Sequence, residues 1–249
     1  MADSARSGSD GRPKFDRILL KVSGESLAKA GELGIDSDAL NHLAREIIDA
    51  TNAGCEVAVV VGGGNIIRGA ALAQDGLIPQ ASADYMGMLG TIINGVALKE
   101  ALEHHGKPAR LMSAINITAV AEPFIRGRAL RHFEKGRVII LAGGTGNPFC
   151  TTDTAAALRA TELNCAVILK ATKVDGVYTA DPKKDRSATR YESITFTEAL
   201  EKQLRIMDLT AFSMCMEQRV PIVVFDFAKS GNIRRAAHGE SVGTLIHNA

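Results

Sequence analysis

The sequence has few aromatic residues, and its charges nearly cancel. It contains no Trp, three Tyr and eight Phe, and its 29 Lys and Arg residues are matched by 28 Asp and Glu residues. A surface that stacks nucleic-acid bases needs clustered aromatic and basic side chains, and an anionic membrane attracts a basic surface. The composition therefore argues against nucleic acid and membranes as partners, and any site for an anion must be local.

The sequence also lacks a long apolar run and paired cysteines. No stretch approaches the roughly 18 apolar residues of a membrane span, and residues 1–14 lack the apolar centre of a signal peptide. We expect a cytoplasmic protein with a disordered leader over residues 1–14 and one domain over residues 15–249. The cysteines form no CxxC pair and have no His at zinc-finger spacing, which favours small apolar residues in a reducing compartment: Cys55, Cys150, Cys165 and Cys215.

Several common catalytic motifs are missing as well. The Gly-Lys pair at 106–107 is followed by Pro108 and has no upstream glycine, so it forms no P-loop. A GxGxxG motif that began at Gly62 would need glycine at position 67, where the sequence has Ile67. GxSxG, HExxH and the HRD/DFG set of protein kinases do not occur either. These absences weaken the P-loop, Rossmann, hydrolase, zinc-protease and protein-kinase interpretations.

What the sequence does contain is an alternation of β-branched runs with amphipathic stretches. This pattern predicts βα units around a mainly parallel sheet. Residues 174–196, which include Asp-Gly and a proline, predict a hairpin followed by an exposed loop. Start and stop signals predict helices over 37–53, 82–105 and 153–164, and the apolar runs predict strands over 17–22, 56–61, 109–113, 137–142, 166–171 and 221–227.

The loops that follow these strands carry glycine and cations. In an open parallel sheet, ligands bind beyond the carboxyl ends of the strands. Glycine-rich backbone there approaches a large anion closely, and Lys or Arg supplies full positive charge. Glycines 62–64 and glycines 143, 144 and 146 would form two walls of a phosphate site, with Lys21 and Arg68 as cations. The alternative is that these glycines only make sharp corners between strand and helix.

Five segments together resemble the bacterial uridylate (UMP) kinases of the amino acid kinase family. The resemblance spans about residues 15 to 247 and implies an α/β fold with three αβα layers around a mainly parallel sheet. The strand-glycine turn is shared with amino-acid and carbamate kinases, whereas GTGNPF and DYMGM resemble a pocket for a nucleoside monophosphate. The segments are KVSGE (21–25), GGGNIIRG (62–69), DYMGM (84–88), GGTGNPFCTTD (143–153) and KATKVDGVYTADP (170–182).

The resemblance implies transfer of a phosphoryl group from MgATP to UMP, with Mg²⁺ bound through the ATP phosphates. Lys21, Arg68 and Asp153 would form the catalytic set. For ATP, the resemblance implies Lys21, Ser23, Gly24, Gly64, Arg68, Thr172, Tyr178 and Asp181. For UMP, it implies Gly63, Asp84, Thr145, Gly146, Asn147, Pro148, Phe149, Cys150, Thr151 and Thr152.

Several of these residues have a second interpretation. Asp153 could be an ordinary residue at a helix start, although we favour a role in placing Lys21 or the metal. Asp84 could face solvent, or it could accept hydrogen bonds from the ribose hydroxyls. Lys170 could be a further cation or a solvated lysine at a strand end. Cys150 departs from the family pattern, because many relatives have an aromatic residue there.

The resemblance also implies a homohexamer, and in some members activation by GTP and inhibition by UTP. Residues 29–34 fall where some members have a GTP-activator segment, but this segment varies too freely to assign that role. We therefore predict a cytoplasmic UMP kinase. Two alternatives stay open: an amino-acid or carbamate kinase of the same fold, and a nucleotide-binding protein without catalysis.

Overall fold

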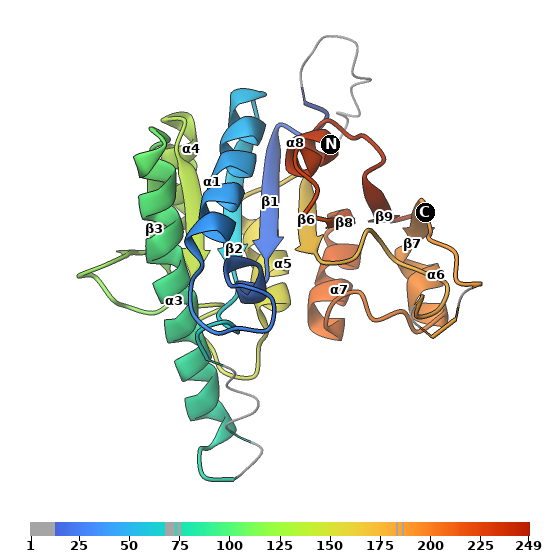
Figure 1. Ribbon diagram of the computed structural model, residues 1–249, viewed down its shortest axis with the longest axis horizontal. Helices are drawn as coiled ribbons and strands as arrows, with labels where there is room; N and C mark the ends of the chain where they lie inside the picture. The colour runs from blue at the N-terminus through green and yellow to red at the C-terminus, as the bar shows by residue number, and fades with distance from the viewer. Residues whose placement is uncertain (1–12, 68–72, 74–75, 183, 186) are drawn as a thin grey trace.

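The computed structural model describes residues 13–67, 73, 76–182, 184, 185 and 187–249. Within these residues, nine strands form one sheet in the order β4-β3-β5-β2-β1-β6-β8-β9-β7 (Figure 1). All neighbouring pairs are parallel except β8 and β9. The strands are β1 (Arg17–Val22), β2 (Glu56–Val61), β3 (Ala109–Ser113), β4 (Glu122–Pro123), β5 (Val138–Ala142), β6 (Val167–Thr172), β7 (Ser193–Thr195), β8 (Ile222–Asp226) and β9 (Gly243–His247).

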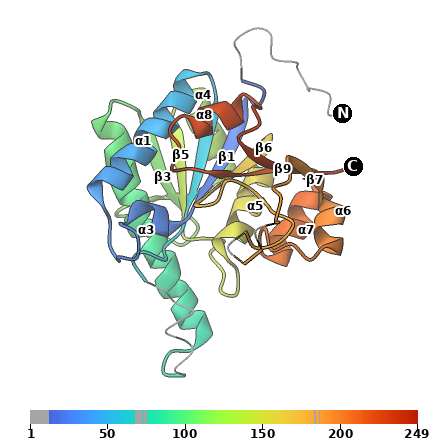
Figure 2. The same cartoon turned by 45° about the vertical axis from the view of Figure 1, so that its right-hand side comes forward.

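Helices cover both faces of the sheet and complete three layers (Figures 1 and 2). One face carries α1 (Ser37–Asn52), α3 (Gln80–His104) and α8 (Asn232–Ala237), with the short 3-10 helix η1 (Gly24–Leu27) beside them. The other face carries α4 (Arg126–Glu134), α5 (Thr152–Glu162), α6 (Phe196–Glu201) and α7 (Leu209–Glu217). The predicted αβα class with a mainly parallel sheet is confirmed.

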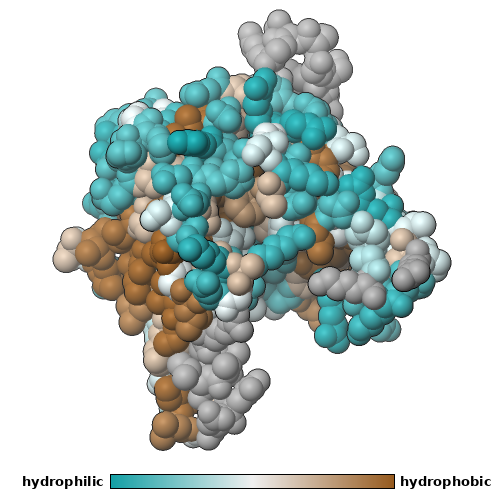
Figure 3. Space-filling view, viewed as in Figure 1, coloured by the Kyte–Doolittle hydropathy of each residue, from teal (hydrophilic) through white to brown (hydrophobic). Residues whose placement is uncertain are grey.

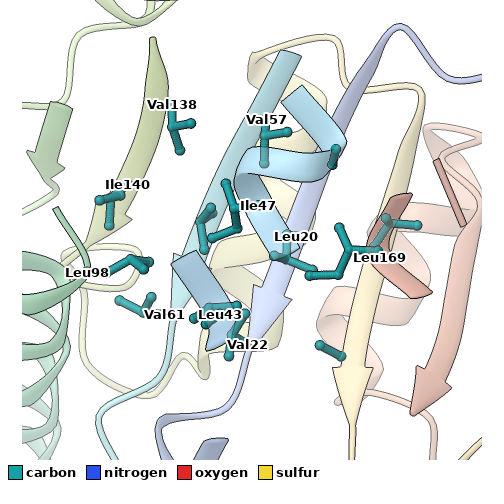
Figure 4. Packing of buried hydrophobic residues seen from close by; sticks show 14 of the residues in the cluster. Leu20, Val22, Leu43, Ile47, Val57, Val61, Leu98, Val138, Ile140 and Leu169 are labelled. Carbon is teal, nitrogen blue, oxygen red and sulfur yellow. The ribbon is translucent and has the colours of Figure 1, made fainter. Parts of the chain in front are cut away.

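Two apolar cores lie between these layers because the central strands are buried on both faces. Leu20 of β1 points toward α1, where it packs in one cluster with Leu43 and Ile47 (Figure 4). The neighbouring Leu19 belongs to the cluster on the opposite face, together with alanines of α5. Successive side chains of a strand point to opposite faces, so the continuous apolar run at residues 18–20 serves both cores.

The start and stop signals in the sequence act as expected. Asp36 caps α1, since its Oδ1 accepts a hydrogen bond from Ala39 N at 3.0 Å. Thr151 caps α5 in a reciprocal pair with Thr154. Gly54 and Gly106 follow α1 and α3 with φ of 98° and 77°, a left-handed conformation that glycine adopts at little cost. These signals fix where the helices begin and end. The carboxyl ends of the parallel strands and the N-terminus of α5 lie at one edge of the sheet.

The six predicted strands and three predicted helices are present, with ends shifted by at most two residues. The strands β4, β7 and β9 were not predicted. The interpretation of residues 174–196 is only partly right: a single antiparallel bridge joins Tyr178 to Arg190, and residues 193–196 form β7 and the first residue of α6 instead of a loop. These residues become a strand because β9, about 50 residues later, pairs with them.

Two further expectations concern the chain as a whole. Among the described residues, no helix has the length and apolar character needed to cross a membrane. The predicted leader lies outside the described residues except for Pro13 and Lys14.

Candidate nucleotide and phosphate site

A first cavity of about 260 Å³ opens at the carboxyl ends of β1 and β2. The loops after these strands form its floor, α3 forms one side, and the N-terminus of α5 faces it. Its lining includes backbone-rich turns and few charged groups: Lys21, Ser23, Gly24, Gly62, Gly63, Gly64, Ile67, Ala83, Asp84, Gly87, Met88, Thr91, Gly144, Cys150, Thr151 and Thr152.

The three glycines of the turn after β2, at residues 62–64, have different surroundings. A Cβ on Gly62 would lie 2.7 Å from Gly24 N, and a Cβ on Gly63 would lie 2.6 Å from Gly87 O of α3. These two glycines therefore allow close packing of protein against protein. A Cβ on Gly64 would meet no protein atom within 4 Å. Only Gly64 of the three leaves open space at the cavity, which is what close approach of a ligand to the backbone requires.

Two buried asparagines hold the β2 turn against α3. Asn94 Nδ2 donates to Gly62 O at 2.7 Å and to Asn65 Oδ1 at 2.6 Å. Asn65 Nδ2 donates to Asn94 Oδ1 and to Gly34 O, and Gly34 N donates to Asn65 O. Both side chains are almost fully buried. Sequence reasoning assigned no role to either residue, because the contact joins positions 29 residues apart.

The loop after β5 closes one side of the cavity. Gly143 N donates to Thr91 Oγ1 at 2.8 Å, and Thr145 Oγ1 accepts from Asn147 N at 3.2 Å. Phe149 has a left-handed backbone, with φ of 65°, and its N–H donates to Asp84 Oδ2 at 2.8 Å. Asp84 therefore anchors this loop to α3.

The predicted catalytic Asp153 lies between two lysines. Its Oδ1 is 2.8 Å from Lys21 Nζ, and its Oδ2 is 2.7 Å from Lys170 Nζ. Lys170 Nζ also donates to Ile206 O at 2.6 Å. The three side chains are only 12–14% exposed. A carboxylate in this position orients both ammonium groups and balances part of their charge.

The surroundings of this cluster shift two pKa values. Burial acts to raise the pKa of Asp153, but the charges of Lys21 and Lys170 outweigh it, and the pKa lies below its ordinary value. Burial lowers the pKa of Lys170, although the opposite charge of Asp153 works against it. Asp153 is therefore ionised at neutral pH, as an ion pair with two lysines requires.

A second cavity, of about 870 Å³, lies on the other side of this cluster, beyond β6. Lys170 lines it, whereas Lys21 lines the first cavity, so Asp153 joins the two. Its other lining residues come from the end of β6 and the segment after it, from residues 203–206 and from β8: Thr172, Val174, Gly176, Val177, Tyr178, Ala180, Asp181, Pro182, Lys184, Gln203, Leu204, Arg205, Ile206 and Val224.

The structure sorts the predicted site residues into three groups. Arg68 lies outside the described residues. Residues 145–149 form the loop beside the first cavity but do not line it. The remaining predicted residues line a cavity or form the cluster: Lys21, Ser23, Gly24, Gly63, Gly64, Asp84, Cys150, Thr151 and Thr152 for the first, Thr172, Tyr178 and Asp181 for the second, and Asp153 between them.

The cysteines fall into two groups, buried and exposed. Cys55, Cys165 and Cys215 are buried, as expected for small apolar residues, and burial raises the pKa of Cys165 to about 12. Cys150 is exposed and lines the first cavity, so it differs from the three buried cysteines and lies in the part of the site where the resemblance implies UMP.

The sequence and fold of this chain are similar to those of known proteins. The model of the amino acid kinase family matches residues 16–226. The chain belongs to the amino acid kinase family. Among solved structures of this family, the chain is similar to a UMP kinase from Bacillus anthracis, with 41% identity and a TM-score of 0.92 over 95% of this chain and 97% of that one. It is also similar to a UMP kinase from Ureaplasma parvum, with 37% identity and a TM-score of 0.89 over 94% of this chain and 99% of that one.

Proposed function

We propose that this member of the amino acid kinase family transfers the γ-phosphoryl group of ATP to UMP and releases UDP and ADP. The observation that carries the proposal is the Lys21–Asp153–Lys170 cluster, which joins two cavities at the carboxyl edge of the sheet. The two UMP kinases similar to this chain, at 41% and 37% identity, support the choice of UMP as acceptor.

The proposal assigns one nucleotide to each cavity. UMP would occupy the first cavity, with its ribose at Asp84 and its uracil at the loop of residues 145–152. The adenosine of ATP would occupy the second cavity, near Thr172, Tyr178 and Asp181. The ATP phosphates would then extend past Lys170 and Lys21 toward Gly24 and Gly64, so that the two phosphate groups meet beside the cluster.

The chemistry asked of the protein is mainly electrostatic. A phosphate oxygen of UMP forms a bond to the γ-phosphorus, and the bond from that phosphorus to the β,γ-bridging oxygen breaks, with its electron pair leaving on ADP. The attacking oxygen is already largely deprotonated at neutral pH, so no general base is needed. The two lysines bring together and neutralise two polyanions, and Asp153 holds both ammonium groups in place.

Mg²⁺ fits this arrangement as an ion that arrives with ATP. Among the described residues, no group of three or more His, Cys, Asp or Glu side chains could hold a metal ion, and Asp153 is already paired with two lysines. Mg²⁺ commonly keeps several water molecules and binds through substrate phosphates. When bound there, it would supply further neutralisation of the phosphate charge.

The test is an assay of ADP release with UMP, CMP, AMP, GMP, aspartate, glutamate and carbamate as acceptors. We expect UMP to be strongly preferred. Cytosine reverses a donor and an acceptor relative to uracil, and each buried group left unpaired costs about 1–3 kcal/mol. Comparable kcat/KM for UMP and CMP would refute a uracil-specific pocket. Turnover of an amino acid or carbamate instead of UMP, or binding without ADP release, would refute the proposed function.

We also propose a cytoplasmic homohexamer, as in the family resemblance. The exposed side of α3 supports self-association, because Tyr85, Leu89 and Ile93 are 45–48% exposed and lie four residues apart. Figure 3 shows the apolar surface that runs along this helix. We further propose that GTP activates the enzyme and that UTP inhibits it. The same assay tests both effects when each nucleotide is added.

A further inference from the structure

One short segment, residues 206–208, contacts both halves of the proposed site. Ile206 lines the second cavity, and its carbonyl oxygen accepts the hydrogen bond from Lys170. Two residues later, Asp208 begins α7 and contacts the N-terminus of α5, whose cap Thr151 lines the first cavity. The segment therefore links the walls of the two cavities.

Asp208 uses its two carboxylate oxygens for different purposes. Oδ1 accepts from Ala211 N at 2.9 Å and caps α7, which is an ordinary helix cap. Oδ2 accepts from two hydroxyl groups of α5, Thr151 Oγ1 at 2.5 Å and Thr154 Oγ1 at 3.0 Å. This second set of contacts is not needed to cap α7.

The contact with Asp208 determines what the Thr151 hydroxyl can do. Because its proton is donated to Asp208, its lone pairs remain available to accept from Asp153 N at 3.0 Å and Thr154 N at 3.3 Å. The carboxylate of Asp208 thus fixes the first turn of α5. That turn carries Asp153, which in turn holds Lys21 and Lys170.

These contacts form a closed ring. It runs from Asp208 through Thr151 to Asp153, then to Lys170, and returns through the carbonyl group of Ile206. We propose that Asp208 is a positioning residue that fixes the two cavities relative to each other, and so sets the distance between the donor and acceptor phosphates. This inference rests on the proposed function, because it concerns transfer between two bound nucleotides.

Asp36 provides a matched control. It also caps a helix through Oδ1, with 3.0 Å to Ala39 N, but it lines neither described cavity, and the nearest cation to its Oδ2 is the exposed Lys29 at 3.9 Å. Substitution of either aspartate by asparagine changes a cap in the same way. Only Asp208→Asn replaces the acceptor of the two α5 hydroxyls with a donor.

The experiment measures kcat, the KM for each nucleotide and Tm for wild type, Asp208→Asn and Asp36→Asn. We expect Asp208→Asn to lower kcat by about 10-fold to 100-fold, since small misplacements of reacting groups have effects of this size, with each KM within about twofold of wild type. We expect Asp36→Asn to keep wild-type kcat, while its Tm falls by about as much as the Tm of Asp208→Asn. A wild-type kcat in Asp208→Asn, with only Tm lowered, would overturn the proposal.

A second variant covers the case in which Asp208→Asn does not fold. Thr154→Val keeps Asp208 and removes one of its two hydroxyl partners. We expect kcat to fall about threefold or more, because the first turn of α5 is then less firmly placed. An unchanged kcat in Thr154→Val would count against the proposal. Absence of UDP formation by wild type would refute the proposed function and the Asp208 proposal together, whereas failure of the Asp208 proposal alone leaves wild-type UDP formation intact.

Discussion

At the scale of single residues, the central feature is one buried carboxylate shared by two lysines. Lys21 is 12% exposed and lies 2.8 Å from Asp153, so its ammonium group is fixed in the wall of the first cavity. We predict that Lys21→Ala lowers kcat by about 10²–10³, the usual effect of removing one preorganised donor to developing charge. Steady-state kinetics with both nucleotides varied gives this value.

The control for Lys21→Ala is Lys99→Ala. Lys99 also lies 2.8 Å from a carboxylate, that of Glu103, but on the surface of α3 away from both cavities. We expect this variant to keep wild-type kcat, since ion pairs at the protein surface contribute little. If folded Lys21→Ala is as active as Lys99→Ala, Lys21 is not part of the catalytic set.

The glycine turn gives a second residue-scale prediction. A Cβ on Gly64 would meet no protein atom, so we predict that Gly64→Ala leaves Tm within about 1–2 °C of wild type but raises the KM for a nucleotide, because the methyl group enters the cavity. Gly63→Ala should behave in the opposite way and lower Tm, since its Cβ would lie 2.6 Å from Gly87 O. Thermal unfolding and kinetics on both variants separate the two roles. A nucleotide KM unchanged in Gly64→Ala would show that no ligand approaches this turn.

Sequence reasoning reached these residues because they lie at the ends of strands. Lys21 and Gly64 lie at or just beyond the ends of apolar runs, and a parallel sheet brings such ends to one edge. The partners of Lys170 could not be reached in the same way. Its contacts with Asp153 and Ile206 join positions 17 and 36 residues away, and local pattern carries no information on such pairs. Lys170 therefore had two equally good interpretations until the fold placed it.

At the scale of elements, the buried Asn65–Asn94 pair fastens the β2 turn to α3. Asn94→Leu would leave Gly62 O and Asn65 Oδ1 without their donor, whereas Asn65 Nδ2 would keep its hydrogen bond to Gly34 O. We predict a loss of about 1–3 kcal/mol in the free energy of unfolding for each group left unpaired, measured by urea denaturation. Asn41→Leu is the comparison, because Asn41 is half-buried and its side chain pairs with His105 at 3.1 Å. Equal losses in the two variants would contradict the role of the buried pair.

Prediction from sequence succeeded for elements with local signals and failed for those that depend on distant partners. β1 and β2 contain apolar runs at residues 18–20 and 57–61, and α5 begins at a capping threonine. β7 has three residues and exists because β9 pairs with it. The Tyr178–Arg190 bridge likewise depends on contacts of its flanks, such as Val177 N to Thr244 Oγ1 at 2.8 Å. Tertiary pairing, and not local preference, decides such short strands.

At the scale of the whole molecule, α3 extends well beyond the edge of the sheet and carries an apolar side (Figures 1 and 3). Tyr85, Leu89 and Ile93 recur every four residues and therefore lie on one side of the helix. An exposed apolar stripe of this kind marks a surface that another protein covers. We propose that a second copy of this chain covers it in the proposed homohexamer, and we predict that a charge placed there separates the subunits.

The variant is Ile93→Glu, measured by sedimentation velocity beside wild type and Leu200→Glu. Ile93 is 48% exposed on α3 and Leu200 is 37% exposed on α6, so each accepts a carboxylate without burying it in the monomer. We expect Ile93→Glu to sediment as a smaller species at unchanged secondary structure, because a carboxylate buried against an apolar partner surface is strongly unfavourable. Leu200→Glu should sediment like wild type. If Ile93→Glu sediments as a species of the same size as wild type, this side of α3 is not the contact between subunits.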